Sequence, residues 1–167
     1  MNALHRTAFR FATVLALGLA SLGAQAFEMR GFRGVSWGEG VESLGASQLV
    51  QTDGNVSCYR REAENLIFGD SPLQEVRYCF HRDQFFMVSL GAALSSKALA
   101  AEFRRAYGAP SSRQAKAAVW GNKSGSARAE VVATSQGGSS LALYSNQYDP
   151  SGTQAMDTVQ HTASLAP

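Results

Sequence analysis

Short apolar runs bounded by turn residues predict a chain with several β-strands. Residues 73–81 alternate strictly, so that apolar side chains from Val76 onward fill one face and Glu75, Arg77 and Cys79 the other. The two residues after this run predict a tight hairpin to the next strand. The full set of expected strands is residues 32–37, 56–62, 73–81, 84–90, 117–121, 127–134 and 139–145.

Two helices are expected among these strands. Ser36 and Glu39 have the S-x-x-E spacing of a capping box, which predicts a short helix through residues 41–44. Between Ser95 and Tyr107 the apolar residues recur at helical spacing, and a glycine and then a proline follow. The second helix is therefore the most strongly patterned element of the chain.

This order of elements predicts an α+β fold. A helix followed by three strands occurs twice, in halves of about 32–90 and 95–145, which indicates a pseudo-duplicated helix-plus-three-strands unit. We expect an antiparallel sheet with two helices on one face, formed by residues 27–145 as a single domain. Residues 146–167 show no period and are expected to form a flexible C-terminal tail.

Residues 1–26 have the pattern of a secretory signal peptide. Arg6 and Arg10 precede a charge-free apolar run at residues 11–23, and small residues follow up to Ala26. We expect cleavage between Ala26 and Phe27, and therefore a periplasmic or secreted protein. The apolar run is too short to span a bilayer as a helix, so no stable membrane anchor is expected.

Loss of this segment changes the charge of the chain. The sequence has 15 basic and 13 acidic residues, and removal of Arg6 and Arg10 leaves 13 of each. Affinity for nucleic acid grows with the number of phosphates that a protein neutralises. A neutral mature chain is therefore not expected to bind nucleic acid.

The two cysteines of the chain, Cys58 and Cys79, remain after cleavage and are expected to form a disulfide, because exported proteins fold in an oxidising compartment. If they lie opposite each other on antiparallel strands, the register is fixed. The opposed pairs are then Tyr59–Tyr78, Arg60–Arg77 and Glu62–Glu75. A competing arrangement places residues 65–68 as a strand between the two, which would hold the cysteines too far apart to bond.

Residues for common active sites are sparse. His81 lies near Asp83, but in a turn and without the G-x-S-x-G elbow of a hydrolase, so a small hydrolase is the least favoured function. Residues 121–124 lack the glycine that precedes the lysine of a phosphate loop. The cysteines and the scattered histidines lack the spacing of a zinc site. We expect no catalytic residue, no cofactor and no metal.

Several carboxylates lie close together in the first half, as in a glycosidase, but solvated strand positions explain them more simply. They are Glu62, Glu64, Asp70 and Glu75.

The mature chain contains 10 arginines but only 3 lysines. Arginine suits bidentate carboxylate contacts and stacking on aromatic rings at interfaces. This pattern predicts a partner-binding face in the first half, although an Ala- and Gly-rich composition explains the arginines equally well. The candidate residues are Arg33, Trp37, Arg60, Arg61 and Arg77.

Three short motifs resemble those of small exported or lipid-anchored bacterial proteins of unknown function. They are F-x-G-V-x-W-G at Phe32–Gly38, the strand end Arg77–Phe80, and Y-G-A-P at Tyr107–Pro110 with Trp120 in the strand that follows. The order of elements resembles that of secreted β-lactamase inhibitor proteins and of the small lipoproteins of outer-membrane assembly. The resemblance implies protein binding without catalysis. The chain departs from those families in having no lipobox and a single cysteine pair.

The sequence therefore predicts a non-catalytic periplasmic protein-binding module of the inhibitor, immunity-type or envelope-accessory kind. Its expected partner is another exported or envelope protein. The competing interpretation is a small-molecule carrier with an apolar cleft between sheet and helices. The aromatic residues expected to line that cleft are Phe85, Phe86, Tyr107 and Trp120.

Overall fold

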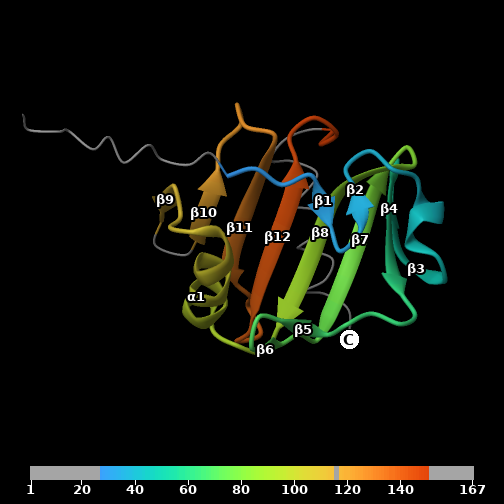
Figure 1. Cartoon of the computed structure of the whole chain (residues 1–167). Helices are drawn as coiled ribbons and strands as arrows, with labels where there is room; N and C mark the ends of the chain where they lie inside the picture. The colour runs from blue at the N-terminus through green and yellow to red at the C-terminus, as the bar shows by residue number, and fades with distance from the viewer. Residues whose placement is uncertain (1–26, 115–116, 151–167) are drawn as a thin grey trace, which may run out of the picture.

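The computed structural model describes residues 27–114 and 117–150 (Figure 1). Its largest element is an eight-stranded antiparallel sheet with the strand order β3-β4-β7-β8-β12-β11-β10-β9. The strands are β3 (Ser47–Asp53), β4 (Val56–Arg61), β7 (Glu75–His81), β8 (Gln84–Ala92), β9 (Ser112–Arg113), β10 (Ala117–Gly121), β11 (Ala127–Ala133) and β12 (Ser139–Ser145).

One face of this sheet is covered by small elements (Figure 1). They are the hairpin of β1 (Gly31–Phe32) and β2 (Val35–Ser36), the 3-10 turn η1 (Val41–Leu44), the hairpin of β5 (Ile67–Phe68) and β6 (Ser71–Pro72), and the helix α1 (Ser96–Tyr107). Leu99 and Phe103 of α1 are fully buried in the main core. The Phe103 ring lies 4.7 Å from the Trp120 ring, between centroids.

The opposite face of the sheet carries a second, smaller core. It includes the two cysteines with Phe86, Met87 and Tyr144. A β-bulge in β8, opposite Cys79, inserts one extra residue, so that Phe85 enters the main core while Phe86 and Met87 both enter the second one. The central strands are therefore buried on both faces.

The expected α+β fold with two helices on one face is wrong, because the structure is mostly β. The described residues contain a single α-helix, α1, which begins after the expected N-cap: Ser95 Oγ accepts a hydrogen bond from Ala98 N at 3.3 Å. At Ser36–Glu39 one of the two hydrogen bonds of a capping box forms: Ser36 N donates to Glu39 Oε2 at 2.9 Å.

No α-helix follows Ser36–Glu39, because the backbone of residues 38 and 39 forms hydrogen bonds with the sheet instead. Gly38 N donates to Phe85 O and Phe85 N donates to Glu39 O, each at 2.8 Å, and Gly38 has a φ of +85°. Only the turn η1 forms after it.

The expected duplication of a helix-plus-three-strands unit is also wrong. Residues 47–53 form the edge strand β3, where no strand was predicted, and the first half contains no α-helix. The alternation in β3 is broken by a bulge between Leu49 and Gln51, which explains why its pattern is weak. Only the second half has the expected order of helix and strands.

The direct register between the cysteine strands is confirmed. Cys58 and Cys79 are opposed and form a disulfide with a Cα–Cα distance of 4.1 Å, and Tyr59 faces Tyr78. The competing strand does not intervene, because β5 pairs with β6 in a separate small sheet. The strands separate after Tyr59 and Tyr78, so the expected charged pairs beyond them are not formed.

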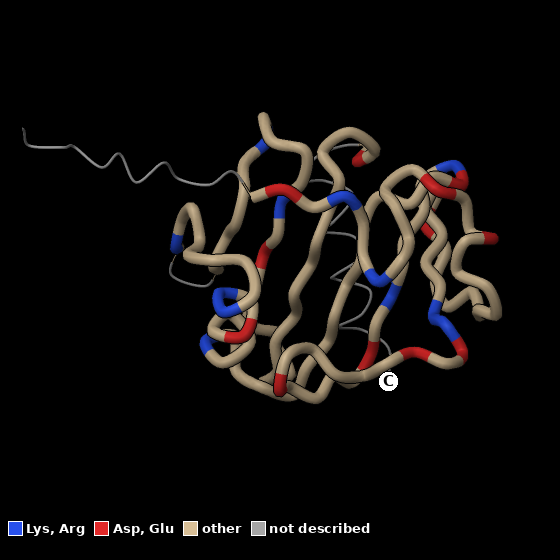
Figure 2. The backbone as a smooth tube through the Cα atoms, viewed as in Figure 1, with Lys and Arg blue, Asp and Glu red and all other residues tan. Residues whose placement is uncertain are grey.

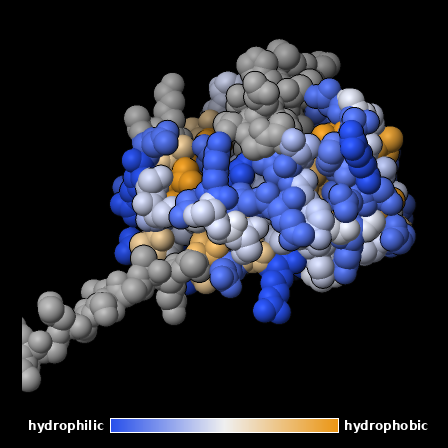
Figure 3. Space-filling view, turned by 90° about the horizontal axis from the view of Figure 1, so that it is seen from above, coloured by the Kyte–Doolittle hydropathy of each residue, from blue (hydrophilic) through white to orange (hydrophobic). Residues whose placement is uncertain are grey.

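The expected signal peptide and most of the expected tail, residues 151–167, lie outside the described residues. The start of that tail is tied to the sheet: Arg128 donates to Asp149, whose side chain is only 3% exposed. None of the described helices has the length and apolar character that crossing a membrane requires. Seen from above, the surface is mainly hydrophilic with separate apolar spots (Figure 3).

Replacing Cys58 and Cys79 together by alanine is expected to lower the free energy of unfolding by about 3 kcal/mol, because the bond closes a long loop in the unfolded chain. Urea denaturation followed by tryptophan fluorescence measures the loss. Denaturing the unaltered protein with and without reductant isolates the cross-link from the two side chains. A difference of less than about 1 kcal/mol in that comparison would contradict the expectation.

Candidate functional site

Beyond the disulfide, β4 and β7 separate like the prongs of a fork. Their pairing ends at Tyr59 and Tyr78, although β4 continues to Arg61 and β7 starts as early as Glu75. On their outer sides both strands stay paired, β4 with β3 and β7 with β8. The Tyr59–Tyr78 pair therefore forms the closed apex of an opening in the sheet.

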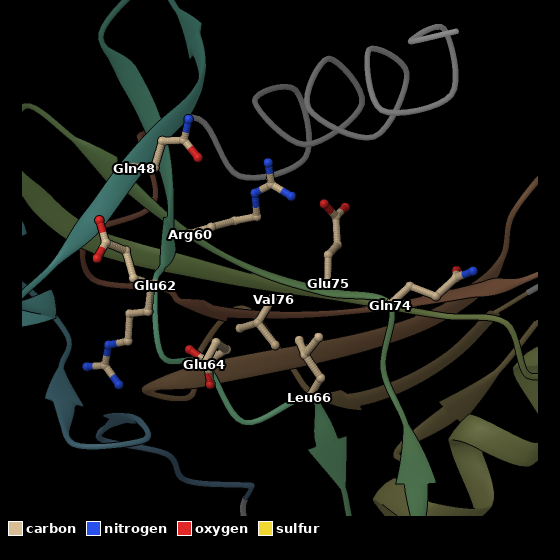
Figure 4. Close-up of a pocket in the computed structure, with 9 residues that line it drawn as sticks. Gln48, Arg60, Glu62, Glu64, Leu66, Gln74, Glu75 and Val76 are labelled. Carbon is tan, nitrogen blue, oxygen red and sulfur yellow. The ribbon is translucent and has the colours of Figure 1, made fainter.

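This opening contains a cleft of about 330 Å³, here called the fork cleft (Figure 4). Its lining residues are Gln48, Arg60, Arg61, Glu62, Glu64, Leu66, Gln74, Glu75 and Val76. Figure 4 shows Arg60 and Glu75 extending on one side of the cleft, with Glu64, Leu66 and Val76 on the other. In Figure 2 both signs of charge lie at this end of the sheet, whereas β12 in the middle carries none.

Backbone groups face each other across the fork cleft without ladder partners. In an antiparallel pair, hydrogen-bonded and non-hydrogen-bonded positions alternate, and the second kind has the shorter Cα–Cα distance. Cys58 and Cys79, with 4.1 Å between their Cα atoms, therefore occupy a non-hydrogen-bonded position. The apex pair is then hydrogen-bonded, and the next N–H and C=O groups aimed across the gap belong to Arg61 and Val76. Because the ladder ends before them, these groups have no ladder bond.

A largely buried ion pair supports one side of the cleft. The Arg33 guanidinium binds the Glu64 carboxylate and donates to the carbonyl oxygens of Asn65 and Ile67, the latter at 2.5 Å. Tyr78 Oη donates to the other Glu64 oxygen at 2.8 Å. The Glu64 side chain is only 8% exposed, and both of its oxygens are engaged. Glu64 therefore fixes the loop after β4 against the β1–β2 hairpin.

The arginines of the cleft differ in their contacts. Arg61 donates to Arg33 O at 3.2 Å and stacks its guanidinium 4.9 Å from the centre of the Tyr78 ring. Its Nε is buried and has no hydrogen-bond partner. Arg60 and Glu62 are exposed and form no ion pair with any described residue. Arg60, Arg61 and Glu62 are thus the charged lining groups that remain outside ion pairs.

Tyr78 remains a hydrogen-bond donor over a wide pH range. Burial raises the pKa of its phenol, and the bond to the Glu64 carboxylate raises it further. A neutral phenol donates to the carboxylate, whereas a phenolate would repel it.

The five residues predicted to bind a partner lie in different places. Arg60 and Arg61 line the fork cleft, and Arg33 supports it through Glu64. Arg77 binds Glu75 at 2.8 Å and donates to Gln51 at 3.2 Å. Trp37 packs on Phe85 in the core, with ring centroids 4.6 Å apart, and its Nε1 donates to Met29 O.

Sequence reasoning did not select the acidic and aliphatic residues of the cleft. In the sequence, Glu62, Glu64 and Glu75 have the pattern of solvated strand positions, and Leu66 carries no signal of a site. The change from two arginines at 60–61 to alternating glutamates is the signal that marks this strand end. It shows a cluster of charges but not the separation of the strands.

The other candidate groups do not assemble into a site. Asp83 Oδ1 accepts from Val41 N at 2.9 Å, so this carboxylate anchors the turn η1. The four aromatic residues of the carrier interpretation do not line one cleft: Phe85 and Trp120 lie in the main core, Phe86 lies in the second core, and Tyr107 is 39% exposed. Within residues 27–114 and 117–150, no cluster of His, Cys, Asp and Glu has the composition of a metal site.

No protein-family model, curated protein or solved structure matches the chain.

Replacing Glu64 by glutamine is expected to lower the free energy of unfolding by about 2 kcal/mol, because Arg33 and Tyr78 lose a charged acceptor. Chemical denaturation measures the change. Glu62→Gln, which removes the same charge from an exposed position of the same loop, is the matched control and should change stability by no more than about 0.5 kcal/mol. Equal losses in the two variants would contradict the role of the ion pair.

The stability of the protein is expected to fall as the pH rises above about 10. Burial raises the pKa of Tyr78, Tyr107 and Tyr144, so these phenols stay protonated in the folded state while the unfolded chain ionises. The unfolded state then binds fewer protons, and the free energy of unfolding decreases with pH. Urea midpoints between about pH 9 and 11 measure the slope, and Tyr78→Phe should make it shallower. An unchanged slope in that variant would contradict the assignment.

Proposed function

We propose that the protein is a non-catalytic, exported protein-binding module whose fork cleft binds an extended segment of a partner protein. The observation that carries this proposal is the pair of strand ends, at Arg61 and Val76, that face each other without a ladder bond. A polypeptide main chain has donors and acceptors along its edges, so an extended segment can pair with the Arg61 backbone groups that β7 leaves without a ladder bond.

The character of the lining favours a peptide over a small apolar ligand. Small-molecule sites are lined mainly by apolar and aromatic side chains. In the fork cleft only Leu66 and Val76 are apolar, and no aromatic residue lines it. Alternating side chains of an extended peptide would meet Leu66 and Glu64 on one side of the cleft and Arg60 and Glu75 on the other.

The charges of the lining argue against nucleic acid as the ligand. Two arginines stand beside three glutamates, so a phosphate backbone would meet repulsion as well as attraction. Protein surfaces carry both signs of charge and match such a lining. No residue that lines the cleft has an imidazole, hydroxyl or thiol side chain, the groups most used in covalent catalysis. The lining therefore suits a binding site better than an active site.

The cellular location is part of the proposal. The pattern of residues 1–26 supports export to the periplasm or beyond, and the disulfide between Cys58 and Cys79 is typical of proteins that fold there. The partner would then be another exported or envelope protein. An enzyme under inhibition and a component of envelope assembly both fit this description.

Site-specific photo-crosslinking tests the proposal. A benzoylphenylalanine residue in place of Leu66, which is 42% exposed beside the cleft, is expected to form adducts with a discrete partner in the exported fraction of the host. The same probe in place of Tyr107, 39% exposed on α1, is the matched control and should not capture that partner. Adducts from both positions, or from neither, would contradict binding at the fork cleft.

A further inference from the structure

We propose that the segment bound in the fork cleft is the free C-terminal end of a protein chain, with its carboxylate at the apex beside Arg60 and Arg61. This inference rests on the proposed function and specifies the chemistry of its ligand. Three features of the cleft lead to it: a closed apex, the distribution of unpaired charge, and the small volume.

The apex is closed. Tyr59 and Tyr78 are paired across it, and the disulfide cross-links the next pair of residues. A chain that enters between the strands from the open end therefore cannot continue in the plane of the sheet. A chain that ends at the apex meets no such obstacle, so the geometry favours a terminus over an internal segment.

The charged groups that are not in ion pairs select the type of terminus. Glu64 and Glu75 each bind an arginine outside the lining, Arg33 and Arg77. The remaining charges are two arginines and Glu62, with the arginines directly after the apex residue Tyr59 and the glutamate nearer the open end. The apex is therefore positive, which favours a carboxylate over an amine.

Arginine also has the geometry for this contact. Its planar fork binds both oxygens of a carboxylate, and such charge-assisted bonds are stronger than neutral ones. The buried Nε of Arg61 has no acceptor in the unliganded protein, which is unfavourable. A carboxylate at the apex would supply an acceptor.

The direction and size of the ligand follow from the same geometry. A chain whose C-terminus lies at the apex runs antiparallel to β4 and parallel to β7, so its last residues reach the unpaired backbone groups of Arg61. The volume of about 330 Å³ lies at the lower limit of ligand sites and admits only a few residues. An apolar side chain among these last residues would contact Leu66, which is 42% exposed.

A peptide panel with matched ends tests the inference. Fluorescein-labelled hexapeptides, with the last three positions varied among Ala, Leu, Phe, Asp and Lys, are prepared both as free C-terminal acids and as amides. Binding to the full chain is measured by fluorescence anisotropy. We expect a subset of the free acids to bind, and amidation to weaken their affinity by about tenfold or more, because a charge-assisted bond is lost.

Arginine variants connect the effect to the cleft. Arg60→Gln, at an exposed position, should weaken the binding affinity of the free acids by about tenfold and leave the weak binding of the amides unchanged. Arg113→Gln, an exposed arginine on β9 at the far edge of the sheet, is the matched control and should have no effect.

Two results would overturn the inference: equal binding of acids and amides, or no binding by any peptide of the panel. If Leu66 still gives the specific crosslink in either case, partner binding at the cleft stands and only the choice of a C-terminus is wrong. If the crosslink fails as well, both proposals are wrong.

Discussion

The covalent pairing of Cys58 with Cys79 is the constraint on which the rest of the structure depends. A shift of one residue between β4 and β7 would exchange their faces, and the cross-link prevents such a shift. With this register Tyr78 enters the main core and Cys79 the second one. The same register determines which backbone groups point across the fork, so the architecture and the cleft have one origin.

This register also explains why the strands separate. One step beyond the apex it would place Arg60 opposite Arg77, and two steps further Glu62 opposite Glu75. Like charges directly opposed on neighbouring strands destabilise a sheet. The separation avoids both contacts and leaves Arg77 and Glu75 free to bind each other on β7. A pattern that is unfavourable for a continuous sheet thus produces an opening at its end.

Sequence patterns predict an element correctly where its own residues determine its structure. Helix α1 combines a serine cap, an apolar stripe and a glycine stop, and its position was predicted from the sequence. The turn at residues 41–44 shows the limit, because Gly38 and Glu39 form backbone bonds with Phe85, more than forty residues away. Strand β3 was missed for a related reason: it is an edge strand with a bulge, and its pairing with β4 rather than its own alternation defines it.

Only some residues of the candidate site could be predicted from the sequence, because the role of each charged residue depends on residues far away in the chain. Arg33 and Arg61 look alike as isolated arginines, yet one closes an ion pair with Glu64 while the other retains a donor without a partner. The total charge of the chain therefore says little about the cleft, where paired and unpaired groups are separated by position.

The cleft is held open before any ligand arrives. The disulfide fixes its apex, and the Arg33–Glu64 pair fixes the loop on one side. In the proposed function, binding to such a preformed site would require less ordering of the protein, so a few hydrogen bonds and one charged contact would suffice for measurable affinity. In the proposed binding mode the closed apex would set the selectivity, because every residue added beyond the ligand's end would have to leave the plane of the sheet.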